Sequence, residues 1–329
     1  MKLTKTILNL NMLAVLLTLF SCTSFLPGDK PLEGGNKENA KAGGNKIEVI
    51  DFGENPIGKK GLCYNHLTAA EVQALGSDPA GVKWVYNWAP APTAAEDTLF
   101  TQYNILFVPM QWGLSTEQSR QALKDYYTSH PNCRYLLGYN EPNLGAGVGG
   151  SGITPAQAAA DWDTLEAIAE EFNLELVGPA LQYSGETLSD GKIYSTPQLW
   201  MDAFIAEYKK LHSGKEPRYD YFALHCYMNW PSAQSGYIKE YAQKYGKQIW
   251  LTEFCAWEYN NGGQNESMEK QTSSMKEKLS FMEGSNTVAK YAWFMSHGNV
   301  SAIPYNSIFE NKNSDGSLTT LGKAYLNLN

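Results

Sequence analysis

The sequence predicts an α/β fold built as a single (β/α)8 TIM barrel, and two observations carry that prediction. From residue 60 onwards, short runs rich in β-branched and aromatic residues alternate with stretches of helical periodicity. The runs are almost continuously apolar, which is typical of parallel strands buried on both faces. Eight such strand and helix units in roughly 265 residues fit the usual size of this barrel, about 250 residues.

The eight apolar runs are the predicted strands, taken in chain order. They cover Lys60–Tyr64, Val82–Trp88, Asn104–Trp112, Arg134–Asn140, Leu174–Ala180, Tyr221–Tyr227, Gln248–Phe254 and Val288–Met295. The stretches between them predict helices, of which the clearest are Glu117–Tyr127, Thr154–Glu171, Pro197–Leu211, Gly236–Tyr245 and Glu266–Met282. A doubly wound open sheet is the alternative architecture. The segment after the first strand, Gly61–His66, lacks the glycine-rich phosphate motif that nucleotide-binding sheets carry there.

The N-terminal residues are typical of a targeting segment. A basic start is followed by a short apolar stretch over residues 10–20, and Leu19-Phe20-Ser21-Cys22 is similar to the lipobox of bacterial lipoproteins, whose cysteine is acylated. The apolar stretch is too short to be a transmembrane helix. The next residues are polar and rich in glycine and proline, with almost nothing to bury.

We therefore expect three parts in the chain. Residues 1–21 form a lipoprotein signal peptide, residues 22–46 form a flexible tether that begins at the acylated Cys22, and residues 47–329 form the barrel domain. The mature protein is expected to be exported and held at a bacterial membrane, the outer membrane or cell surface, by its lipid alone.

Composition and charge limit the function classes. The chain of 329 residues is 43% hydrophobic and carries a formal net charge of -8, so it can bury one large core and has the wrong sign of charge for nucleic acid. Its 20 tyrosines and nine tryptophans suit ordinary packing, and they also suit stacking on the apolar faces of sugar rings.

Four cysteines follow the lipobox: Cys63, Cys133, Cys226 and Cys255. Three of them lie in apolar strand-like runs, where a free cysteine behaves as a small hydrophobic residue. We expect buried thiols, with a bridge between Cys226 and Cys255 as the alternative if their strands are neighbours. None of the four has zinc-ligand spacing.

Polar and aromatic residues gather at the predicted C-terminal ends of the strands, the face on which barrels of this kind carry their active sites. Each has a simpler interpretation by itself: His225 as a hydrogen-bonded core residue, Tyr227 or Trp112 as packing. Their convergence on one face favours a functional site. The residues are Tyr86, Asn87, Trp88, Gln111, Trp112, Asn140, Glu141, His225, Cys226, Tyr227, Glu253 and Trp293.

Two of these residues are carboxylates at the end of apolar runs. Leu137–Pro142 delivers Glu141, and Ile249–Phe254 delivers Glu253. A carboxylate at the tip of a buried strand is costly to desolvate, which favours a chemical role over a packing role. Paired carboxylates across a cleft are the minimal machinery of glycoside hydrolysis.

The strand motifs resemble those of glycoside hydrolase family 128, a family of β-1,3-glucanases within the large clan of retaining barrel glycosidases. The resemblance spans residues 60 to 325. The chain departs from the family pattern at Cys226, where an aromatic residue is frequent, and at Asn143, where aspartate is frequent. The motifs are Lys83–Trp88, Val108–Gly113, Leu137–Pro142, His225–Tyr227, Trp250–Phe254 and Tyr291–Phe294.

The resemblance implies roles for the site residues. Glu141 is expected to be the acid/base, protonated when it must donate to the leaving oxygen, and Glu253 the ionised nucleophile. Asn140 is placed to bind the sugar 2-hydroxyl, and Tyr227 or His225 to donate to Glu253.

The remaining aromatic residues are expected to contact substrate. We expect Trp293 to form the floor of the subsite where the bond breaks, and the other stacking candidates are Trp88, Trp112 and Trp230. Trp84, inside the second strand, is expected in the core.

Three functions remain open at this point. The first is retaining hydrolysis of β-1,3-glucan or its oligosaccharides. The second is action of the same kind of barrel on another β-glycan, and the third is a non-catalytic barrel that captures glycan at the cell surface. No metal or other cofactor is expected, because neither glutamate needs one and no cluster with ligand spacing stands out.

Overall fold

The computed structural model describes residues 50, 52–54, 58–77, 81–257, 263–298, 303–310 and 315–328. The predicted signal peptide, the lipobox Cys22 and the tether lie outside the described residues. No helix in the described part of the chain is both long enough and apolar enough to cross a bilayer.

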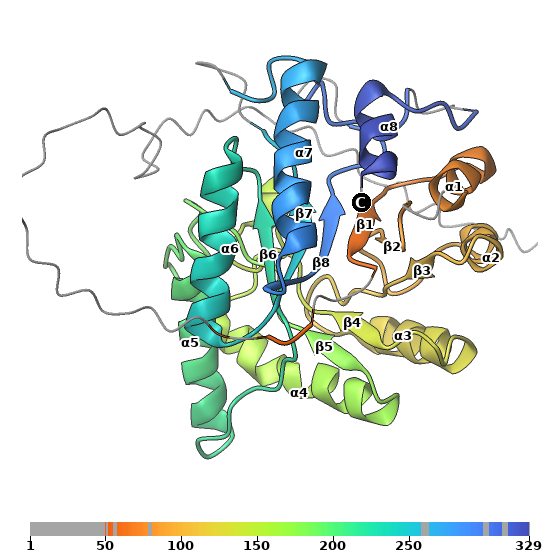
Figure 1. Cartoon of the computed structure of the whole chain (residues 1–329). Coiled ribbons are helices and arrows are strands. Elements are labelled where there is room, and N and C mark those ends of the chain that lie inside the picture. Colours follow the sequence, from red (N-terminus) through yellow and green to blue (C-terminus); the bar gives the residue numbers. More distant parts are fainter. Residues whose placement is uncertain are drawn as a thin grey trace, which may run out of the picture. The chain divides into compact units, whose positions relative to one another are not determined.

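Eight parallel strands form the centre of the domain (Figure 1). Six of them pair in the order β3-β2-β1-β8-β7-β6, and β4 pairs with β5. Parallel bridges from Met110 to Leu137 and from Val177 to Tyr221 link the two groups at both junctions, so the strand order runs round a ring. The strands are β1 (Lys60–Cys63), β2 (Trp84–Tyr86), β3 (Leu106–Phe107), β4 (Tyr135–Leu137), β5 (Glu175–Val177), β6 (Phe222–Cys226), β7 (Ile249–Phe254) and β8 (Val288–Trp293).

A helix follows each strand and lies outside the strands (Figure 1). Six of these helices begin after a threonine whose side-chain oxygen accepts the backbone N–H three residues on, which fixes the loop that leads from strand to helix. The α-helices are α1 (Ala69–Gly76), α2 (Ala94–Gln102), α3 (Glu117–Ser129), α4 (Pro155–Glu171), α5 (Pro197–Leu211), α6 (Pro231–Tyr245), α7 (Met268–Gly284) and α8 (Thr320–Asn327); a short 3-10 helix η1 (Ala146–Val148) precedes α4.

The core has two layers, as a barrel requires. A large outer layer packs the strands against the helices, and a smaller inner layer fills the ring of strands. Trp84 lies in the inner layer, 1% exposed, against Trp250 and Tyr86, which confirms its predicted core position. Gly61 on β1 leaves room for this indole, because a Cβ atom there would lie 2.3 Å from a ring carbon of Trp84.

All eight predicted strands are found, but several are shorter than predicted. β3 pairs over Leu106–Phe107 only, since Pro109 has no N–H to continue the ladder. Helix α6 begins at Pro231, not at Gly236, because proline is well suited to the first helical position. Helices α1 and α2 were not among the clearest predicted helices, although each begins with a Thr-x-x-Glu capping box.

The four cysteines Cys63, Cys133, Cys226 and Cys255 are buried free thiols, as expected, and the alternative bridge between Cys226 and Cys255 is not formed. Burial raises the pKa of the Cys255 thiol, and burial likewise raises that of Cys226. Both thiols are therefore held in the uncharged form that suits a core residue.

Candidate active site

The two glutamates and His225 meet at the C-terminal ends of the strands. Glu253 lies inside β7 and His225 inside β6, while Glu141 follows β4 by four residues. The backbone N–H of Glu141 donates to the carbonyl of Ala180 at 2.8 Å, and the φ of Glu141 is +43°, in the left-handed region. Local backbone geometry therefore turns Glu141 inward, at a cost that packing elsewhere must offset.

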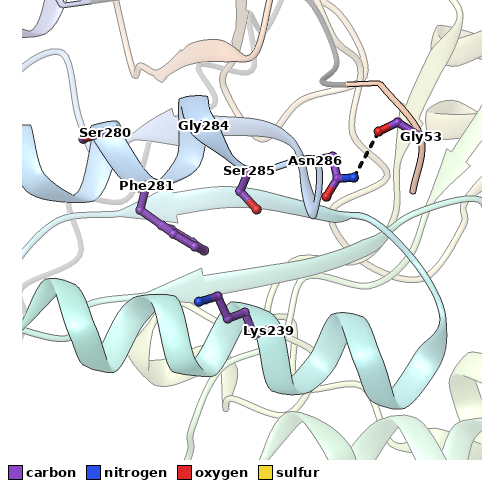
Figure 2. Close-up of a pocket in the computed structure, with 7 residues that line it drawn as sticks. All are labelled: Gly53, Lys239, Ser280, Phe281, Gly284, Ser285 and Asn286. Carbon is purple, nitrogen blue, oxygen red and sulfur yellow. Dashed lines mark hydrogen bonds between the residues drawn. The ribbon is translucent and has the colours of Figure 1, made fainter. Parts of the chain in front are cut away.

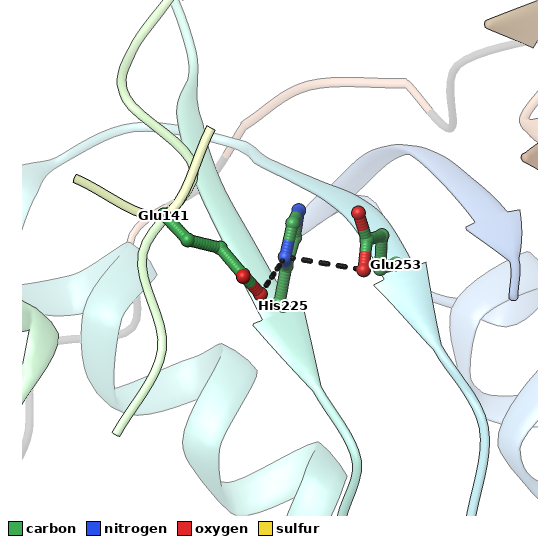
Figure 3. A group of neighbouring side chains, drawn as sticks. All are labelled: Glu141, His225 and Glu253. Carbon is green, nitrogen blue, oxygen red and sulfur yellow. Dashed lines mark hydrogen bonds and ion pairs between the residues drawn. The ribbon is translucent and has the colours of Figure 1, made fainter. Parts of the chain in front are cut away.

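His225 lies between the two carboxylates (Figure 3). Its Nδ1 is 2.7 Å from Oε1 of Glu141 and 3.4 Å from Oε2 of Glu253. Because both neighbours are carboxylate oxygens, Nδ1 is the ring nitrogen that carries a proton. One oxygen of each glutamate and a ring nitrogen of His225 lie within 4.8 Å of one another, so the two carboxylates face each other across a short gap.

Glu253 is held by three further donors. The indole N–H of Trp88 donates to Oε1 at 2.8 Å, and the hydroxyl of Tyr227 donates to Oε2. The hydroxyl of Tyr86 lies 3.2 Å from Oε1 and 3.0 Å from the carbonyl of Thr252, so its single proton is shared between these two acceptors. Each of these bonds stabilises the carboxylate form. The expectation that Tyr227 or His225 faces Glu253 is thus met geometrically by both residues.

Burial and the neighbouring groups in this cluster shift the pKa values of Glu253 and His225. Burial raises the pKa of Glu253 above its ordinary value; the proton-bearing His225 opposes that rise, the carboxylate of Glu141 adds to it, and Tyr227 and Trp88 oppose it. Burial lowers the pKa of His225, but Glu253 and Glu141 more than offset burial and raise that pKa above its ordinary value. Burial and the neighbouring charges therefore act in opposite directions on His225, and the hydrogen-bond donors oppose the effect of burial on Glu253.

Gln182 also contacts Glu141, although it was not among the predicted site residues. Its side-chain amide donates to Oε1 of Glu141 at 2.6 Å. Gln182 follows β5 and the predicted strand Leu174–Ala180, so the rule that led to the other strand ends would have found it.

Among the described residues, Glu141, His225 and Glu253 are also the group that could hold a metal ion, with one ligand atom each. Nδ1 of His225 already pairs with both carboxylates, so a proton satisfies all three groups without an ion. The absence of a cofactor stays a prediction.

Trp293 does not lie where it was expected. Its side chain is fully buried in the outer layer, packs on Phe254 and on Tyr325 of α8, and donates its N–H to the carbonyl of Asn306 at 2.7 Å. A ring with no exposed surface cannot stack on a sugar, so Trp293 does not form the floor of the subsite. Its neighbour Phe294 is half-buried and faces the site instead.

Phe294 belongs to an aromatic cluster beside Glu253. Its ring contacts Trp88 and Tyr227 edge to face, with centroids 6.1 and 5.5 Å apart, and stacks on Trp257 at 6.4 Å. Trp257 in turn meets Tyr227 edge to face at 5.0 Å. Phe294 and Trp257 were not predicted as site residues, and both are partly exposed.

The other predicted contacts are spread over the same face. Trp112 and Trp230 are 38% and 39% exposed and follow β3 and β6, so their rings are open to a ligand. Asn140 is buried; its side-chain N–H donates to the carbonyl of Gly149 at 3.4 Å, and its Oδ1 has no partner among the described residues. Asn87 is half-buried and accepts the backbone N–H of Ala89.

A pocket of this structure is lined by none of the site residues described above (Figure 2). It lies between α6 and α7, where the ammonium of Lys239 sits 5.2 Å from the ring centroid of Phe281. Its remaining lining residues include Gly53 and Asn286, which precede β1 and β8. It therefore opens near the N-terminal ends of the strands, away from Glu141 and Glu253.

Comparison with known proteins places this geometry in context. A family profile described as "Glycosyl hydrolase catalytic core" matches residues 61–325. The chain is similar to the crystal structure of a family 128 (subgroup II) endo-β-1,3-glucanase from Pseudomonas viridiflava, with 35% identity and a TM-score of 0.72, over 84% of this chain and 99% of that one. A subgroup II endo-β-1,3-glucanase from Sorangium cellulosum is 29% identical with a TM-score of 0.68, over 82% and 98%.

A curated relative is the alkali-sensitive linkage protein 1 of Schizosaccharomyces pombe. It is 24% identical over 249 residues, which cover 75% of this chain. The match spans only 40% of the length of that relative.

Proposed function

Because the chain belongs to glycoside hydrolase family 128, we propose that it hydrolyses β-1,3-glucosidic bonds within β-glucan and retains the configuration at the anomeric carbon. One observation carries the proposal: two buried carboxylates face each other at the C-terminal ends of β4 and β7, with an oxygen of each within 4.8 Å. The subgroup II relatives named above, both endo-β-1,3-glucanases, support the substrate and the internal cleavage.

The surroundings of the two glutamates support different roles for them. Glu253 receives hydrogen bonds from Trp88, Tyr86 and Tyr227, which stabilise an anion, as a nucleophile requires. Glu141 receives no hydroxyl or indole donor among the described residues, and its two contacts come from Gln182 and His225. Glu141 is the better candidate to carry a proton and exchange it with the leaving group.

The short gap supports the retaining mechanism. Retaining glycosidases hold their carboxyl groups about 5–5.5 Å apart, whereas inverting enzymes need about 6.5–9.5 Å to admit a water. Glu253 would attack the anomeric carbon directly and form a glycosyl-enzyme, while Glu141 protonates the departing oxygen and later activates the water.

Proton NMR of the first product tests this proposal. A panel of linear and branched β-1,3-glucans, β-1,4-glucan and β-mannan is incubated with the protein, and the anomeric signal is followed from the start. We expect β-anomers of oligosaccharides from β-1,3-glucan. An α-product would exclude the retaining roles, cleavage of another glycan alone would exclude the substrate, and tight binding without cleavage would identify a glycan-capture barrel.

We also propose that the protein is a lipoprotein, on the strength of the sequence motif at Cys22. Labelling with a radioactive fatty acid in a bacterial host should modify the full chain and leave Cys22→Ser unlabelled. A chain that begins near Lys46 should be soluble and fully active, since the barrel domain needs no lipid to fold. Equal labelling of both proteins would exclude the anchor.

A further inference from the structure

Both hydrogen bonds to the side chain of Glu141 end on the same oxygen. The amide of Gln182 donates to Oε1 at 2.6 Å, and Nδ1 of His225 lies 2.7 Å from Oε1. Within the described part of the chain, no donor reaches Oε2. We propose that Gln182 is a positioning residue that, together with His225, makes Oε2 the oxygen that carries and delivers the catalytic proton. This inference rests on the proposed function.

The argument follows from the lone pairs of a carboxyl group. A carbonyl-type oxygen accepts two hydrogen bonds, and Oε1 of Glu141 already receives two N–H donors. A proton on Oε1 would occupy one of these lone pairs and displace a donor. The protonated acid therefore keeps its double-bonded oxygen at Oε1 and its hydroxyl at Oε2, the oxygen that no donor among the described residues reaches.

In the proposed reaction, Oε2 of Glu141 gives up its proton in the first step and takes a proton back in the second. In the first step an oxygen of Glu253 bonds to the anomeric carbon, the glycosidic C–O bond breaks with its electron pair on oxygen, and that oxygen takes the proton from Oε2 of Glu141. In the second step a water attacks the same carbon, gives a proton back to Oε2, and Glu253 leaves as a carboxylate.

The backbone holds Gln182 in this position from both sides. The carbonyl of the preceding Leu181 accepts the backbone N–H of His225 at 2.9 Å, so the segment that carries Gln182 is hydrogen-bonded to the strand that carries His225. The carbonyl of Gln182 accepts the side-chain N–H of Asn143 at 2.6 Å. Asn143 is fully buried and also donates to the carbonyl of Tyr194 at 3.2 Å.

The identity of Asn143 fits this arrangement. Both of its partners are carbonyl oxygens, so the side-chain NH2 of Asn143 can donate to each, whereas a carboxylate there would face two acceptors. Asn143 lies two residues after Glu141, so it ties the loop that carries the acid to the segment that carries Gln182.

Leaving-group dependence tests the positioning role. We compare kcat/KM of wild type and Gln182→Met, a change that keeps the side-chain length and removes the donor, on two substrates. One is a laminari-oligosaccharide, whose leaving sugar needs a proton, and the other is a 2,4-dinitrophenyl laminari-oligosaccharide, whose leaving group needs none. We expect a loss of about 10- to 100-fold on the first and less than about threefold on the second.

Two matched variants separate this role from a structural one. Tyr86→Phe removes a donor from Glu253 and should slow both substrates by similar factors, because the nucleophile serves both. Tyr245→Phe removes an exposed hydroxyl bond to Asp202, away from the site, and should leave the ratio of the two rates unchanged. An equal loss on both substrates in Gln182→Met, or no loss, would overturn the proposal. If Gln182→Met does not fold, Gln182→Leu takes its place.

A second measurement does not depend on activity. The side-chain amide signal of Gln182 in a nitrogen-15 NMR spectrum, assigned by its loss in Gln182→Met or Gln182→Leu, should move in Glu141→Ala and stay in place in Tyr245→Phe. If the chemical shift of the Gln182 amide does not change in Glu141→Ala, the positioning role is overturned even when the enzyme is active. A wild type that cleaves no β-1,3-linked substrate would instead overturn the proposed function.

Discussion

Two carboxylates are buried side by side in this barrel, and hydrogen bonds from individual side chains stabilise them there. Glu141 and Glu253 are 6% and 4% exposed, and buried charges persist only when they are paired and hydrogen-bonded. Two bulky residues at the site, Trp88 and Glu141, have φ values of +62° and +43°. Such conformations cost about 1–3 kcal/mol each and concentrate at functional sites.

Replacing each glutamate should give different results. Under the proposed roles, Glu253→Gln should be inactive on every substrate, because it removes the carboxylate that would form the glycosyl-enzyme. Glu141→Gln should lose most activity on glucan and far less on a dinitrophenyl glycoside, whose leaving group needs no proton. Steady-state kinetics and mass spectrometry of the enzyme with a slow fluoro-sugar check this. A covalent adduct on any residue other than Glu253 would contradict the assignment.

Two tryptophans separate stability from activity. Trp293→Ala should lower the free energy of unfolding by about 3–5 kcal/mol, because it empties a fully buried site. Trp88→Phe keeps a ring and removes the N–H that donates to Glu253, so it should lower kcat with a small change in stability. Urea denaturation measures the loss of stability in each variant, and kinetics of the folded protein measure the loss of kcat. A stable and inactive Trp293→Ala would restore the original placement of that ring at the site.

Two glycines, Gly61 on strand β1 and Gly236 in helix α6, differ in the space available for an added methyl group. A methyl group at Gly61 on β1 would lie 2.3 Å from the Trp84 ring, whereas Gly236 within α6 has nothing within 4 Å of an added Cβ. Gly61→Ala should therefore destabilise the protein by about 1–3 kcal/mol through overpacking. Gly236→Ala should stabilise it by about 0.5–1 kcal/mol, since alanine loses less entropy in a helix.

Urea midpoints of the two alanine variants at Gly61 and Gly236 give both values in one experiment. A neutral Gly61→Ala would show that the inner layer can repack around an extra methyl group. A destabilising Gly236→Ala would show that α6 needs its glycine for a reason other than helix propensity.

The whole molecule should lose stability at alkaline pH because of its buried tyrosines. Burial raises the pKa of Tyr127, Tyr237 and Tyr325 well above the usual value, so the folded state keeps protons that the unfolded state releases near pH 10. Their contribution to stability is complete below pH 10 and is lost as pH rises above it. Burial lowers the pKa of Lys278, which adds stability as pH rises only up to its unfolded value of about 10.5.

We expect the free energy of unfolding, measured by urea denaturation, to fall steeply above about pH 10, by up to about 1.4 kcal/mol per pH unit for each buried tyrosine. Absorbance at 295 nm, which reports tyrosinate, should rise together with the loss of circular dichroism. Tyr127→Phe should reduce the slope by one proton. Ionisation of these tyrosines in a fully folded protein would contradict this account.

The sequence alone was sufficient to predict the barrel and the meeting of Glu141 and Glu253 at one face of it. Apolar runs at regular spacing specify parallel buried strands, and the strand tips share one face because all the strands run in one direction. That reasoning found Glu141, His225, Tyr227 and Glu253 without any knowledge of the contacts between them.

Only the tertiary structure decided which side chains face the site and which oxygen each donor meets. On β8, Tyr291 and Trp293 pack in the outer layer, whereas Ala292 lies in the inner layer and Phe294 is the residue that meets Trp88 and Tyr227 at the site. The bonds from Gln182 and His225 to Glu141 join positions 41 and 84 residues apart. Contacts at such separations depend on how strands pair around the ring, and local sequence patterns do not contain that information.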